Sequence, residues 1–131
     1  SKDYINKFGM PKTPQDLDNH RILTYNQGTQ MKYQYTNWIL TFGLQSGKFR
    51  QPFITFDGSY ALLNATKEGL GISQLGGHFP ALMGIDLVEV LPDYPAPKID
   101  MFFVYPKTQE KSVKIKALLK FLQSKIGEAK S

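Results

Sequence analysis

The sequence contains no cysteine and has only two histidines, His20 and His78, among its 131 residues. The absence of cysteine excludes a disulfide framework, a thiolate metal site and a cysteine nucleophile. Two isolated histidines do not make a histidine-rich metal site either. We therefore expect neither a bound metal nor another cofactor.

Long apolar runs and an amino-terminal leader are also missing. The longest apolar runs, such as 60–63 and 101–105, are far shorter than the roughly 18 residues that a membrane-spanning helix needs. The first residues, Ser-Lys-Asp-Tyr-Ile-Asn, contain no apolar signal-peptide region. These features predict a cytoplasmic protein without membrane contact.

Positive charge is concentrated at the carboxyl end of the chain. The formal net charge is +5, yet residues 1–97 carry eight basic and eight acidic residues, whereas residues 98–131 carry eight lysines and three acidic residues. The apolar residues among these late lysines recur at helical spacing: Ile115, Leu118, Leu119, Leu122 and Ile126. This pattern predicts an amphipathic helix with a solvated lysine face; a nucleic-acid-binding surface is the alternative, although arginine and interleaved exposed aromatic residues are missing.

Apolar patterning and turn residues predict alternating strands and helices. Helices are expected over 3–8, 59–67 and 79–83, and strands over 21–25, 35–42, 48–56, 71–75, 87–91 and 99–105. Gly43–Gly47 suits a five-residue hairpin loop, so strands 35–42 and 48–56 are expected to pair in antiparallel fashion. The run 101–104 is typical of a strand buried on both faces. The pattern as a whole indicates an α/β fold with a mixed sheet.

Catalytic motifs are absent or weak. Neither Ser59 nor Ser73 has the Gly-x-Ser-x-Gly surroundings of a hydrolase nucleophile, and the glycines at 69–77 lack the spacing of a nucleotide-binding loop. His20 has no nucleophile nearby in the sequence and is interpreted as a structural histidine bonded to local backbone. We therefore do not expect an enzyme.

The start of the predicted helix 59–67 is the one local feature that suggests ligand binding. Its first N–H groups and positive dipole end suit a small anionic group, with the Ser59 hydroxyl beside them. A plain capping role for Asp57 or Ser59 is the alternative, and the two roles are compatible.

Six motifs follow one another along the whole chain. They are Ser1-x-x-Tyr4-Ile5-x-x-x-Gly9-x-Pro11-x-x-Pro14-x-Asp16-Leu17-x-x-His20-Arg21-Ile22-Leu23, Trp38-Ile39-Leu40, Ala61-Leu62-Leu63-x-Ala65 with Gly69-Leu70-Gly71-Ile72, Leu87-Val88-x-Val90-Leu91-Pro92-Asp93-Tyr94, Val104-Tyr105-Pro106, and Leu118-x-x-Phe121-Leu122. Each motif is common alone, but their order and spacing are specific. In these motifs the chain resembles the effector-binding domain of LysR-type transcriptional regulators.

The resemblance implies a periplasmic-binding-protein-like (type 2) fold, in which two α/β lobes hold a small molecule between them. Residues 1–97 would be the second lobe, and 98–131 the returning strand and carboxyl-terminal helix of the first. The family's earlier lobe-one segment and its winged helix-turn-helix have no counterpart ahead of Ser1, so we expect an incomplete fold. Its uncovered strand and helix then favour self-association into a homo-oligomer.

The resemblance also implies the position of the effector site. Family pockets draw on the end of the first lobe-two strand and on a strand-to-helix turn, which correspond here to Thr24, Tyr25, Asn26, Thr29, Asp57, Gly58 and Ser59. Many members have asparagine where this chain has Asp57, and an acid there disfavours a nearby carboxylate on the effector.

The function implied by the resemblance is effector sensing. A bound small molecule would shift lobe closure and thereby the DNA-binding geometry of the oligomer, with DNA contacted only through the winged helix-turn-helix. A solute-binding protein of the same fold and a basic nucleic-acid-binding module are the alternatives.

Overall fold

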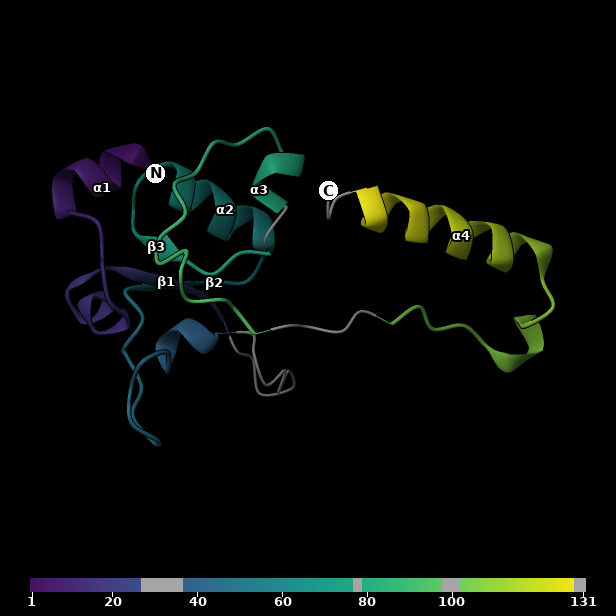
Figure 1. The fold of residues 1–131 in the computed structure, drawn as a ribbon, viewed down its shortest axis with the longest axis horizontal. Coiled ribbons are helices and arrows are strands. Elements are labelled where there is room, and N and C mark those ends of the chain that lie inside the picture. The colour runs from purple at the N-terminus through teal and green to yellow at the C-terminus, as the bar shows by residue number, and fades with distance from the viewer. Residues whose placement is uncertain (27–36, 77–78, 98–101, 129–131) are drawn as a thin grey trace. The chain divides into compact units, whose positions relative to one another are not determined.

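The computed structural model describes residues 1–26, 37–76, 79–97 and 102–128, which belong to two compact units, 1–97 and 98–131 (Figure 1). The first unit contains α1 (Lys2–Phe8), η1 (Pro14–Asn19), β1 (Ile22–Tyr25), η2 (Trp38–Leu40), β2 (Ile54–Phe56), α2 (Ser59–Lys67), β3 (Ile72–Ser73) and α3 (Phe79–Leu82). The second contains η3 (Lys107–Gln109) and α4 (Val113–Glu128). The assignment of these units to two lobes stays a prediction.

The first unit is built on three parallel strands in the order β2-β1-β3. Leu23 in the central strand lies opposite Ile54 on one side and Ser73 on the other. The approach of β3 to β1 requires Gly71, because a Cβ atom at this position would collide with the carbonyl oxygen of Arg21. That same carbonyl accepts the N–H of Ile72 at 2.8 Å.

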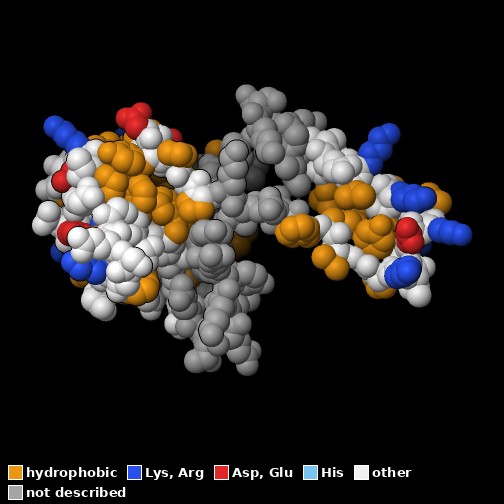
Figure 2. Space-filling model, turned by 60° about the horizontal axis from the view of Figure 1, so that its bottom comes forward, with side chains coloured by type: hydrophobic (Ala, Val, Ile, Leu, Met, Phe, Trp, Pro, Cys, Tyr) orange, Lys and Arg blue, Asp and Glu red, His pale blue; other side chains and the backbone are white. Residues whose placement is uncertain are grey.

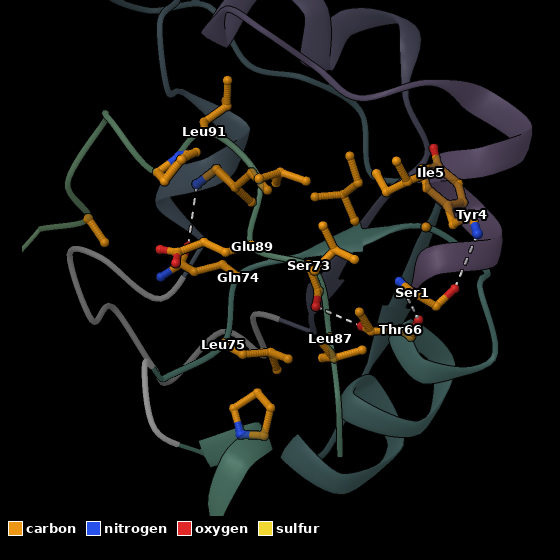
Figure 3. A pocket seen from close by; sticks show the side chains of 18 of the residues that line it. Ser1, Tyr4, Ile5, Thr66, Ser73, Gln74, Leu75, Leu87, Glu89 and Leu91 are labelled. Carbon is orange, nitrogen blue, oxygen red and sulfur yellow. Dashed lines mark hydrogen bonds between the residues drawn. The ribbon is translucent and has the colours of Figure 1, made fainter.

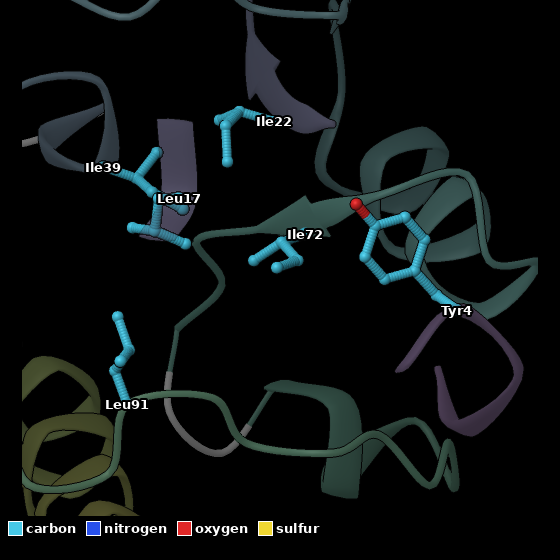
Figure 4. Packing of buried hydrophobic residues seen from close by; sticks show 6 residues of the cluster. All are labelled: Tyr4, Leu17, Ile22, Ile39, Ile72 and Leu91. Atoms are coloured by element: carbon cyan, nitrogen blue, oxygen red, sulfur yellow. The ribbon is translucent and has the colours of Figure 1, made fainter. Parts of the chain in front are cut away.

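Side chains of β1 alternate between two apolar layers, as expected for a strand. On one face, Leu23 packs against Leu62 and Ala65 of α2. The other face is covered by α1, η1 and η2, whose side chains meet those of β1, β3 and the later chain (Figure 4). This second cluster consists of Tyr4, Leu17, Ile22, Ile39, Ile72 and Leu91. Each fully buried Leu or Ile contributes about 2 kcal/mol, so these two layers hold the sheet together.

The hydroxyl of Tyr4 joins α1 to the start of β1. It accepts the backbone N–H of Arg21 at 2.9 Å and lies 3.1 Å from Nδ1 of His20. Because the oxygen already accepts one bond, its own proton is available for the histidine nitrogen. Burial lowers the pKa of His20, which favours the neutral ring needed to accept that proton. His20 thus has a structural role, with a side chain rather than local backbone as its partner.

The predicted antiparallel hairpin is wrong. Residues 38–40 form η2 instead of a strand, and 54–56 form β2, which pairs in parallel with β1; the beginning of the predicted strand 35–42 lies outside the described residues. The described strands therefore make a parallel sheet, not the mixed one expected. The physical reason is the buried side chain of Arg50, which binds the carbonyl oxygens of Ile39 and Phe42 at 3.0 and 2.6 Å and holds this segment in a compact loop.

Two other predicted strands do not form within the described residues. Residues 87–91 follow an irregular path, and so do 102–105, the described part of the predicted strand 99–105. Phe102 and Val104 are 82% and 85% exposed, which contradicts burial on both faces. A strand needs a neighbour for its backbone groups, and neither segment has one here.

The predicted carboxyl-terminal helix is confirmed as α4. Its described apolar side chains are half-buried at Ile115, Leu119 and Leu122, whereas Leu118 and Phe121 are exposed. The lysines at 111, 114, 116, 120 and 125 are all exposed, and Figure 2 shows lysine and hydrophobic side chains together on the surface of this unit. The helix is amphipathic, as expected, with an apolar side that this unit only partly covers.

Candidate functional site

The carboxyl ends of β1 and β2 bring two predicted site residues into contact. Asn26 follows β1, and Asp57 follows β2. Because these neighbouring strands are parallel, their ends meet at one edge of the sheet. The backbone N–H of Asn26 donates to Phe56 O at 2.8 Å, and its side-chain amide donates to Oδ1 of Asp57 at 2.7 Å. Sequence positions 31 residues apart thus form one polar surface.

The helix α2 begins directly beside this pair. Its N-cap is Gly58, with extended backbone, and no side chain caps the first turn. The predicted capping role of Asp57 or Ser59 is therefore wrong: Oδ1 of Asp57 accepts from Asn26 instead, and Ser59 is the first residue of the helix. The uncapped first turn leaves N–H donors and a positive dipole end next to exposed Asp57, Gly58 and Ser59.

Two other predicted site residues are integrated into the fold. The ring of Tyr25 packs against the apolar layer under α2, while both of its backbone groups bind the side chain of Asn37. Thr24 is 2% exposed, and its hydroxyl has no hydrogen-bond partner in the described part of the chain. Thr29 lies outside the described residues. The structure thus brings together Asn26, Asp57, Gly58 and Ser59, and buries Thr24.

Asn37 and Gln74 are polar residues of this region that sequence reasoning missed. Asn37 is 8% exposed and binds Tyr25. Gln74 follows β3, and its Oε1 accepts the N–H of Ile39 at 3.4 Å. The position of Gln74 directly after a predicted strand could have suggested it, since strand ends of a parallel sheet share an edge. Nothing local marks Asn37, whose partner is 12 residues away.

A separate cavity of about 490 Å³ lies in the first unit, between β3 and residues 85–92 (Figure 3). Its walls include Thr66, Ser73, Gln74, Leu87 and Glu89. None of the six predicted site residues that the structure describes lines it. The predicted effector site and this cavity are therefore different places on the unit.

Two further findings concern the described ranges. They hold no cluster of three or more potential His, Asp or Glu metal ligands. No helix in them has both the length and the apolar character needed to cross a membrane.

Comparison of the sequence with known proteins identifies its family. Residues 1–127 match the family model of the LysR substrate binding domain. The chain is 31% identical over 118 residues to an uncharacterized HTH-type transcriptional regulator of Haemophilus influenzae, covering 88% of this chain and 40% of that protein. It is 30% identical over 130 residues to the uncharacterized HTH-type transcriptional regulator YhjC of Escherichia coli, covering 98% of this chain and 43% of that protein.

The chain thus spans about two fifths of the length of these relatives. No solved structure matches it. The small parallel α/β sheet of the first unit is consistent with the periplasmic-binding-protein-like type 2 fold of this family. Because the family model extends over nearly all of the sequence, the chain belongs to the LysR substrate-binding domain family.

Proposed function

We propose that this chain is the effector-sensing part of a LysR-type transcriptional regulator and binds its effector at the carboxyl edge of β1 and β2. The observation that carries the proposal is the 2.7 Å bond between Asn26 and Asp57 beside the uncapped start of α2. It joins two strand ends into one exposed surface with both donors and acceptors. Tyr25, which packs against the apolar layer under α2, Thr24, which is buried, and Thr29, which lies outside the described residues, are assigned to the proposed site by the family resemblance alone.

The effector is best matched by a neutral or cationic polar molecule. Asp57 is exposed, and none of the ion pairs in the described ranges involves it. A free carboxylate repels an anionic effector group and attracts an ammonium or hydroxyl donor. The Ser59 hydroxyl and the first amides of α2 add donors for a carbonyl or hydroxyl oxygen.

We further propose that effector binding acts as a conformational switch in the longer cytoplasmic regulator. In this scheme residues 1–97 are the second lobe, and residues 98–131 belong to the first. An effector with higher affinity for the closed arrangement shifts the population towards it. The shift changes the geometry of a homo-oligomer whose helix-turn-helix parts contact DNA. Both relatives are named as HTH-type transcriptional regulators, which supports this proposal.

The test is a thermal-shift screen of amines, amino acids, sugars and aromatic acids against this chain, followed by calorimetric titration of any compound that stabilises it. Asn26→Ala and Asp57→Asn should each weaken binding of that compound roughly tenfold, the effect of losing one good polar contact. Asp93→Asn removes the same charge from an exposed position outside the site and should leave affinity unchanged. Unaltered affinity in both site variants would contradict the proposed position.

A further inference from the structure

Arginine occurs at only two of the 16 basic positions of this chain, Arg21 and Arg50. The guanidinium of Arg50 is buried and donates to Asp18 and to three carbonyl oxygens. Arg21 is exposed, and within the described ranges its guanidinium makes no hydrogen bond and no ion pair. The remaining residues of the first unit, 27–36 and 77–78, contain no Asp or Glu. The first unit therefore provides no acidic partner for Arg21.

Two aromatic rings hold the guanidinium of Arg21, and we call Phe8, Arg21 and Phe53 the arginine clamp. Cζ of Arg21 lies 4.9 Å from the ring centre of Phe8 and 4.8 Å from that of Phe53. The ring of Phe8 stacks in turn on the buried ring of Tyr4, with 4.6 Å between their centres. The backbone N–H of Arg21 donates to the Tyr4 hydroxyl, and that of Phe53 donates to Ile22 O at 2.8 Å. The fold thus orders a side chain that is usually mobile, which lowers the entropic cost of binding to it.

The chemistry of the arginine clamp fits a carboxylate. The planar guanidinium offers parallel N–H donors that match the two oxygens of a carboxylate. Lys7 adds positive charge, because its exposed Nζ lies 5.5 Å from the ring centre of Phe8 and belongs to none of the ion pairs of the described residues. A nucleic acid fits less well, since the first unit carries eight basic and eight acidic residues and has no net charge to attract a polyanion.

The open surface around the clamp fits a polypeptide better than a small molecule. Small molecules bind mainly in concave sites, and the clamp residues line neither the cavity beside β3 nor a second one beside Arg50. Phe8 and Phe53 are 37% and 51% exposed, so their rings offer apolar area next to the charge. Arginine and aromatic residues are enriched at the energetic centres of protein interfaces. An acidic side chain with an apolar neighbour matches both features.

The clamp lies away from the proposed effector site. Arg21 directly precedes β1 and Phe53 directly precedes β2, so the clamp is at the amino ends of two neighbouring parallel strands. Asn26 and Asp57 follow the carboxyl ends of the same strands, roughly 16 Å further along at about 3.3 Å per residue. In the proposed function the other lobe faces that carboxyl edge, which leaves the clamp accessible to a separate protein. This step rests on the proposed function.

We propose that the arginine clamp is a docking site for an acidic segment of a partner protein. An Asp or Glu of that segment forms a two-point ion pair with the guanidinium of Arg21. An apolar residue beside it covers the exposed parts of the Phe8 and Phe53 rings. The charge of Lys7 increases the rate of encounter with the acidic segment. The contact requires no bound effector.

The first test is an NMR titration of the isotope-labelled chain with the peptide acetyl-Ala-Glu-Phe-Ala-amide and with its Gln counterpart. The chain has two arginine Nε–H groups, and the buried Arg50 is the internal control for Arg21. We expect the Glu peptide to shift the Arg21 signal and to bind about tenfold more tightly than the Gln peptide, which lacks the charge-assisted pair. Equal affinities, or an Arg21 signal that neither peptide shifts, would overturn the proposal.

The second test uses variants, with the backbone amide signals of Phe8 and Phe53 as reporters. Arg21→Lys keeps the charge and should weaken binding of the Glu peptide roughly tenfold, because an ammonium lacks the planar fork of donors. Lys67→Gln removes an exposed positive charge from α2, which covers the other face of the sheet from α1, and should leave the affinity unchanged. Equal weakening by the two variants would reduce the effect to overall charge and contradict the proposal.

Two further measurements identify the occupant. Acetate and inorganic phosphate should shift the Arg21 signal only at concentrations far above those of the Glu peptide; comparable affinity for either would assign the clamp to a free small anion. Sedimentation velocity of the chain alone should give the same species for Arg21→Lys; an oligomer that this variant dissociates would assign the clamp to a second copy. Either result would overturn the proposal. Because no effector is added, these outcomes are independent of whether the proposed effector site binds its ligand.

Discussion

The side-chain amide of Asn37 forms two hydrogen bonds with the backbone of Tyr25. The N–H of Tyr25 donates to Oδ1 at 3.1 Å, and Nδ2 donates to the Tyr25 carbonyl oxygen at 2.9 Å. Strand β3 ends at Ser73, opposite Leu23, so it does not reach these two groups of β1. Asn37 takes the place of a further residue of β3, and the central strand therefore ends with its backbone paired.

Replacing Asn37 with alanine should lower the free energy of unfolding by about 1–3 kcal/mol, because it leaves two part-buried backbone groups of Tyr25 without partners. Urea unfolding followed by circular dichroism measures the change. The control is Asn64→Ala on the exposed side of α2, which should alter stability by less than about 0.5 kcal/mol. Similar values for both variants would refute the strand-like role of Asn37.

Arg50 should be among the residues whose loss destabilises the chain most. Its guanidinium donates to the carboxylate of Asp18 at 2.6 Å and to the carbonyl oxygen of Pro14 at 2.8 Å, in addition to its two bonds within the loop 39–42. Arg50→Met should cost about 3–5 kcal/mol, because it leaves buried carbonyl oxygens unpaired.

Arg50→Lys should recover only part of that loss, since an ammonium cannot reproduce the planar fork of donors. Arg21→Lys serves as the control, because Arg21 is exposed and lies between the rings of Phe8 and Phe53 at 4.9 and 4.8 Å. Chemical denaturation of Arg50→Met, Arg50→Lys and Arg21→Lys measures their free energies of unfolding and checks that stability increases in this order. Full stability of Arg50→Lys would show that charge alone suffices.

Stability should decrease below neutral pH because of His20. Burial lowers the pKa of this ring in the folded chain below its ordinary value of 6.5, so the unfolded chain binds the proton more readily. The contribution of neutral His20 is complete above pH 6.5 and is lost as the pH falls through that value towards the lower folded pKa. The urea concentration at the midpoint of unfolding, measured from about pH 8 down to about pH 5, should decrease as the pH passes through this window.

His20→Gln should flatten this pH dependence, since glutamine does not titrate in the window. Asp16 opposes the effect of burial, since its negative charge raises the pKa of His20; Asp16→Asn should therefore steepen the pH dependence. An unchanged slope in His20→Gln would assign the effect to other groups.

Gly71→Ala should destabilise the sheet by about 1–3 kcal/mol, because the added methyl group collides with the Arg21 carbonyl between β1 and β3. Gly58→Ala is the matched variant, since nothing lies within 4 Å of its Cβ position and its φ of −144° suits any residue. It should cost less than about 1 kcal/mol. Thermal unfolding compares the two, and equal losses would contradict the close approach of β3.

Short-range sequence patterns were sufficient to predict most of the helices, two of the strands and the family of this protein. Helix periodicity and stop residues predicted α1, α2, α3 and α4 close to their observed bounds, and apolar runs predicted β1 and β3. The order of the motifs predicted the family, which the match over residues 1–127 confirms. In each case the information lies within a few turns of helix or a few residues of strand, where backbone propensity and capping act.

The predicted effector site depends both on short-range sequence patterns and on the tertiary structure. Its residues were selected by resemblance, and their involvement in binding stays a prediction. That Asn26 touches Asp57 could not be derived from their separation of 31 residues. The parallel pairing of β1 with β2 decides it, because only this pairing brings the two carboxyl ends to one edge.

Tertiary structure alone decided the partners of the remaining segments. The hairpin predicted from strand propensity gave way to η2 and a parallel β2, because the guanidinium of Arg50 satisfies carbonyl oxygens from two distant loops at once. Segments 87–91 and 102–105 have strand-like composition but no neighbour in the described structure. Composition indicates that a segment can form a strand; whether it does depends on a backbone edge supplied by residues far away in the sequence.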